Sequence, residues 1–154
     1  MVYRLFVERR KGQDNEAAAL LTELRDLLFI GGLERVRIIN RYDIEDIPPE
    51  LLEECRDTVF SEPATDTVSE ELEAEGGRVF AVEYLPGQFD MRADSAQQCV
   101  RFISPGAAPV VRSAKVYVLY GDLTGISATL INRNDPVISH IESIYITFVY
   151  APRK

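Results

Sequence analysis

The stretch AVEYLPGQFD at residues 81–90 repeats the earlier stretch FVERRKGQD at residues 6–14. Four identities share one spacing of 75 residues (82 − 7 = 75): Val7 with Val82, Glu8 with Glu83, Gly12 with Gly87, and Gln13 with Gln88. In each copy an apolar strand leads into a glycine-containing turn and then into an amphipathic helix. A second strand is expected after each helix, at 35–44 and at 112–122. The repeat therefore predicts a tandem pair of small α+β units, residues 1–75 and 76–154.

Composition limits the class of protein. The chain has 154 residues, of which 46% are hydrophobic and 27% charged, which is typical of a globular protein with a substantial core. Its net charge of −8 argues against nucleic acid or an anionic membrane as partner, because those surfaces require clustered Lys and Arg. We expect no signal peptide, because Met1 leads into a strand interrupted by the charged Arg4 and Glu8. We expect no membrane span, because no apolar run approaches about 20 residues.

The cysteine usage points to a reducing compartment. Cys55 and Cys99 form neither a CxxC motif nor a disulfide framework, and both fall on apolar helical stripes. We therefore expect buried free thiols and a cytoplasmic protein. No metal site is predicted, because the glutamates of the acidic segment 61–77 lack the density of oxygen ligands that a Ca²⁺ loop needs.

The best candidate site is the turn before the second repeat's helix. That helix is expected at about 91–102, and four apolar residues are expected to face inward: Ala93, Ala96, Val100 and Ile103. Polar residues gather around its start: Gly87, Gln88, Asp90, Arg92, Asp94 and Ser95. One interpretation is interdomain docking, in which Gly87 permits a sharp turn and the polar side chains bind another domain. The alternative is purely structural: Asp90 caps the helix and Arg92 pairs with a neighbouring carboxylate.

No catalytic residue is predicted. A glutaminase-type nucleophile would need a Cys beside a His and a carboxylate, but Cys99 lies on an apolar stripe and the single histidine is the distant His140. No glycine-rich loop ends in Lys-Ser or Lys-Thr, as a P-loop would require. The chain by itself is therefore not expected to carry an active site or a cofactor.

The segment VFAVEYLPGQFDMRADSAQQC, residues 79–99, resembles a stretch of the long form of phosphoribosylformylglycinamidine (FGAM) synthase. That family comprises glutamine-dependent ligases of purine biosynthesis. Four flanking phrases resemble its N-terminal region in the same order: VYRLFVE, VRIINRYDIE, TVFSEPATD and SAKVYVLYGDL. The resemblance spans about residues 2–131. It departs from the family at Met91, where Gln is usual, and in the tail 132–154.

The resemblance implies a non-catalytic N-terminal domain similar to two fused copies of the small S subunit of the split enzyme. Its fold would be a pseudo-dimer of ferredoxin-like units, with an antiparallel sheet and helices packed on it. The implied partners are the synthetase and glutaminase domains, and ATP and magnesium would act only in the complete enzyme. Two other classes stay open. One is a small-molecule regulatory module of the ACT type, with Gly12 and Gly87 in its strand-to-helix turns. The other is an independent enzyme.

Overall fold

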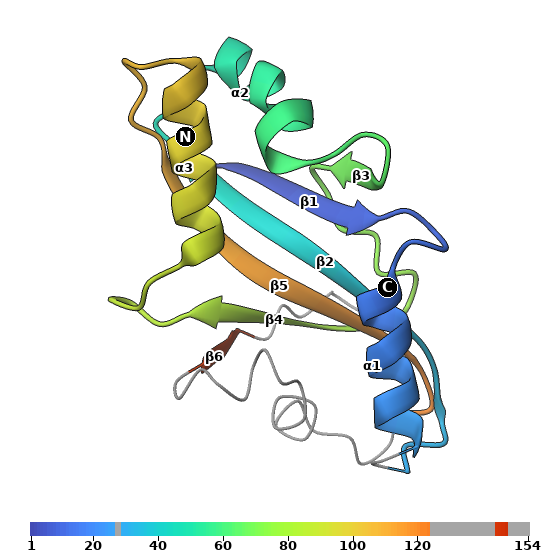
Figure 1. Cartoon of the computed structure of the whole chain (residues 1–154). Coiled ribbons are helices and arrows are strands. Elements are labelled where there is room, and N and C mark those ends of the chain that lie inside the picture. Colours follow the sequence, from blue (N-terminus) through green and yellow to red (C-terminus); the bar gives the residue numbers. More distant parts are fainter. Residues whose placement is uncertain (27–28, 124–143, 148–154) are drawn as a thin grey trace. The chain divides into compact units, whose positions relative to one another are not determined.

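The computed structural model describes residues 1–26, 29–123 and 144–147. The elements follow one another along the chain (Figure 1): β1 (Tyr3–Arg9), α1 (Asn15–Asp26), β2 (Leu33–Glu45), α2 (Pro49–Cys55), a π-helical turn η1 (Arg56–Phe60), β3 (Asp66–Ser69), β4 (Arg78–Tyr84), α3 (Met91–Ile103), β5 (Val110–Gly121) and β6 (Ile144–Thr147). The predicted α+β class is confirmed. His140 and most of the tail 132–154 lie outside the described residues.

The six strands form one sheet in the order β3-β1-β2-β5-β4-β6. Strand β1 pairs antiparallel with both β2 and β3, and β4 pairs antiparallel with β6. Burial alternates along β1, because Leu5 and Val7 are buried while Arg4 is exposed. Arg4 lies opposite Asp43 in the register, and its Nε is 2.5 Å from Oδ1 of that carboxylate.

The chain divides into two compact units, each assembled from three segments. The first unit contains Met1–Gln13, Ile39–Leu72 and Pro86–Ala114. Its core lies between β1, β2, the α2–η1 helices and α3, and it is formed by Leu5, Val7, Tyr42, Ile44, Ile47, Leu52, Cys55, Phe60, Ala93, Ala96, Val100 and Val111. The rings of Tyr42 and Phe60 meet edge to face, with centroids 5.2 Å apart.

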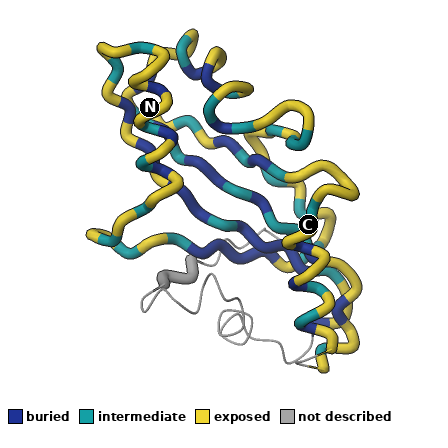
Figure 2. Tube along the Cα trace, viewed as in Figure 1, coloured by how far each residue is buried: buried dark blue, intermediate teal, exposed yellow. Residues whose placement is uncertain are grey.

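The second unit contains Asp14–Ile38, Glu73–Leu85 and Lys115–Lys154. Helix α1 packs here on strands β2, β4 and β5 through a separate core of Leu20, Leu24, Leu33, Val36, Phe80, Val82, Tyr117, Leu119 and Leu123. Phe80 and Tyr117 stack with ring centroids 4.9 Å apart. Buried residues lie along β1, β2, β4 and β5 and on one side of α1 and of α3 (Figure 2).

Each compact unit thus takes segments from both halves of the sequence. Strands β2 and β5 both cross the boundary, at Ile38–Ile39 and at Ala114–Lys115. The division into residues 1–75 and 76–154 stays a prediction. What matters for the candidate site is that residues 86–114, including all of α3, belong to one unit.

Candidate functional site

The turn between β4 and α3 depends on the backbone freedom of glycine. Gly87 has φ +88°, and Gly12 has φ +85° at the matching position of the first repeat. An added Cβ would meet nothing within 4 Å at either position. Glycine is therefore required at these positions for its backbone conformation, because residues with a side chain avoid positive φ. It is not required for lack of space around the Cβ position.

Asp90 ties the start of α3 to strand β5. It is the N-cap residue, and its Oδ1 accepts hydrogen bonds from the backbone N–H of Ala93 at 2.9 Å and the hydroxyl of Ser113 at 2.8 Å. Its Oδ2 accepts from the backbone N–H of Ser113 at 2.7 Å. The capping role predicted from the sequence is confirmed. Because its carboxylate is engaged by these three donors, Asp90 positions the helix.

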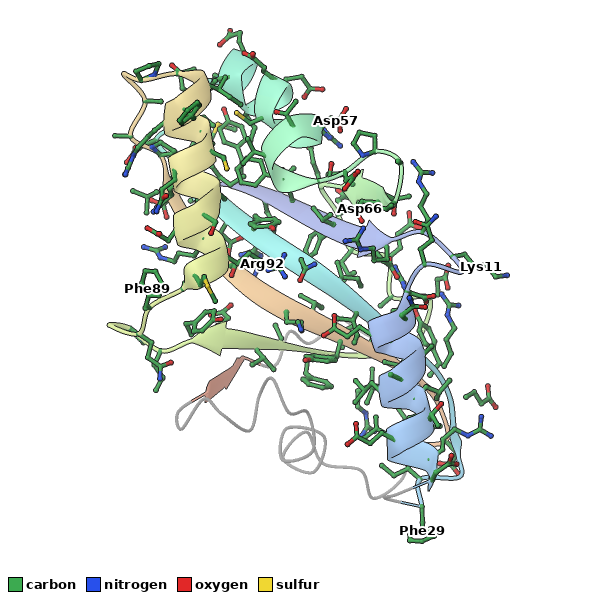
Figure 3. The ribbon with its side chains drawn as sticks, in the orientation of Figure 1. Lys11, Phe29, Asp57, Asp66, Phe89 and Arg92 are labelled. Atoms are coloured by element: carbon green, nitrogen blue, oxygen red, sulfur yellow. The ribbon has the colours of Figure 1, made fainter. Side chains whose placement is uncertain are left out.

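Arg92 lies in the first turn of α3, and its side chain is exposed. Its Nη1 donates to the hydroxyl of Tyr42 on β2 at 3.3 Å. The structural interpretation expected Arg92 to pair with a neighbouring carboxylate, and this expectation is wrong. No carboxylate of the described residues lies within 4.0 Å of the Arg92 guanidinium. Figure 3 shows Arg92 beside α3 and Phe89 on the preceding turn, where it points away from the ribbon.

The other predicted polar residues differ in their surroundings. Asp94 accepts a hydrogen bond at 2.6 Å from the side-chain amide of Gln98, one helical turn later. Ser95 is exposed, and Gln88 is half-buried. The structure therefore places the predicted residues together around the first turns of α3, but Asp94 is directed to a neighbour on its own helix.

Two sequence-based expectations about α3 are wrong. Cys99 is exposed, although it was expected to be buried, and Ile103 is 39% exposed. The buried face of the helix is Ala93, Ala96 and Val100, and Cys99 precedes Val100 by one residue, which rotates it by about 100° from that face. Cys55 is buried as predicted, and desolvation together with the nearby Glu54 carboxylate raises the pKa of its thiol.

Sequence reasoning missed the exposed apolar side chains of this region. Phe89 is 70% exposed, Met91 67% and Phe102 92%. A signal was available, because Met91 and Phe102 are separated by eleven residues and fall on the helical face opposite Ala93, Ala96 and Val100.

The first turns of α3 and the turn before them expose both polar and apolar side chains. Among residues 1–26, 29–123 and 144–147, no three His, Cys, Asp or Glu side chains gather as metal ligands. Within the same ranges, no helix has the length and apolar character needed to cross a membrane. The arrangement can present an apolar and cationic surface to a partner.

A comparison with protein-family models and with curated proteins finds no match to this chain. The resemblance to long-form FGAM synthase therefore rests on the sequence phrases at residues 2–131 alone, and what it implies about function is a proposal.

Proposed function

We propose that this chain is the non-catalytic N-terminal domain of a long-form FGAM synthase, and that it holds the glutaminase and synthetase domains together in the cytoplasm. The observation that carries the proposal is the ordered set of family-like phrases centred on VFAVEYLPGQFDMRADSAQQC, residues 79–99. The complete enzyme would use ATP, magnesium and glutamine to convert the formylglycinamide ribonucleotide to the amidine. This domain would bind none of them.

The architecture supports the tandem ferredoxin-like part of the proposal. Counted from one edge of the sheet the strands are β3, β1 and β2, and counted from the other edge they are β6, β4 and β5. The two orders are equivalent when β1, β2 and β3 are matched with β4, β5 and β6. Strands β1 and β4 have equal lengths and an offset of 75 residues at both ends (78 − 3 and 84 − 9). The turn glycines share this offset and nearly the same φ. A pseudo-dimer of two fused copies would produce these equivalences.

Helices α1 and α3 extend the correspondence with an offset of 76. The buried positions of α1, Ala17, Leu20 and Leu24, map onto those of α3, which are Ala93, Ala96 and Val100. The change from 75 to 76 is explained by one additional residue in the second turn. The natural assignment is Phe89, because GQD in the first copy becomes GQFD in the second.

The first test is enzymatic. The purified chain should neither hydrolyse glutamine nor consume ATP, because no nucleophile–base pair or phosphate-binding loop is present in its sequence. Turnover that survives repurification and disappears in Cys99→Ala or His140→Ala would refute the proposal. Calorimetric titration with amino acids addresses the regulatory module: saturable binding would favour the ACT-type alternative, and a scaffold should show none.

The second test is functional. A long-form FGAM synthase from which the N-terminal domain has been deleted should hydrolyse glutamine without forming a matching amount of amidine. Addition of this chain in trans should restore the ratio, and external ammonium should bypass the defect because the synthetase chemistry is intact. Failure of the chain to restore coupling, while ammonium still supports synthesis, would contradict the scaffold function.

A further inference from the structure

We draw no further inference here: the strongest candidate, the surface patch formed by Phe89, Met91 and Phe102 on the outer side of α3 and in the turn before it, rests on exposed apolar side chains alone, and nothing in the structure shows what covers them.

Discussion

Replacement of Asp90 by alanine tests whether its carboxylate fixes α3 on the sheet. The change removes the N-cap acceptor for Ala93, which is worth about 1 kcal/mol. It also removes the acceptors of the backbone N–H and the hydroxyl of Ser113. Because Ser113 is only 8% exposed, loss of the partner of its backbone N–H should cost about 1–3 kcal/mol more. We expect Asp90→Ala to lower the free energy of unfolding by about 2–4 kcal/mol in sum.

The chain supplies a matched control at the corresponding position of the first repeat. The backbone carbonyl of Asp14 accepts from Ala18 N–H, as that of Asp90 accepts from Asp94 N–H. The Asp14 side chain makes no hydrogen bond with the described residues. Asp14→Ala should therefore lower the unfolding free energy by less than about 1 kcal/mol.

The assay is urea unfolding followed by far-UV circular dichroism. With a slope near 2 kcal/mol per molar urea, Asp90→Ala should move the midpoint down by about 1–2 M. Amide hydrogen exchange at Ala93 and Ser113 should accelerate in the same variant, because these N–H groups lose their acceptors. Equal losses in the Asp90 and Asp14 variants, within about 0.5 kcal/mol, would refute the reasoning.

Three further predictions concern the turns and the thiols. Gly12→Ala and Gly87→Ala should each destabilise the fold by about 1–2 kcal/mol in urea unfolding, and by similar amounts, because both glycines have positive φ and open space around the Cβ position. An aromatic disulfide reagent should label Cys99 at once and Cys55 only in denaturant; rapid labelling of two thiols in the native chain would contradict the burial of Cys55. Desolvation and the Glu54 carboxylate raise the pKa of the Cys55 thiol in the folded protein. The stability contributed by this thiol is therefore complete below the ordinary thiol pKa of about 8.5, and it is lost as the pH rises from there towards the folded-state pKa. Urea midpoints measured from pH 7.5 to 9.5 should therefore fall more in the wild type than in Cys55→Ala; parallel curves would speak against it.

The local elements of the repeat could be predicted because each is encoded in short-range pattern. Strand β4 follows from a short apolar run, the turn from Gly87, and helix α3 from a cap residue followed by apolar residues at helical spacing. The predicted helix 91–102 differs from the observed Met91–Ile103 by one residue. The prediction that Ala93, Ala96 and Val100 face inward is confirmed. The sequence did not exclude Cys99 from the buried face, because Cys99 and Val100 are adjacent and both apolar, and only the packing on the sheet leaves Cys99 exposed.

The long-range partners of these residues could not be predicted from the sequence, because they depend on how distant segments pack together. The capping role of Asp90 is local and was predicted, but its bonds to Ser113 span 23 residues and depend on where β5 lies. Arg92 reaches Tyr42 across 50 residues, and no sequence pattern connects them. The exposure of Phe102 was derivable from helical geometry once Val100 was known to be buried.

The composition of α3 explains which contacts hold this helix on the sheet. Its buried face carries only small side chains, Ala93, Ala96 and Val100, so apolar burial contributes less than in a leucine-lined helix such as α1. Polar contacts supplement it: Asp90 binds Ser113, and Gln97 Oε1 accepts from the backbone N–H of Val111 at 2.9 Å.

The large apolar groups of α3 lie on its outer side and contribute little to holding the helix on the sheet. Phe102→Ser should therefore leave the urea midpoint near that of the wild type, because that side chain is 92% exposed. Asp90→Ala should lower the midpoint, because its carboxylate accepts hydrogen bonds from Ala93 and Ser113 and so holds the start of the helix. A loss in Phe102→Ser as large as the loss in Asp90→Ala would mean that the outer side of α3 is packed against other residues of the chain, and that the exposed phenylalanine, as well as the polar contacts, stabilises the helix.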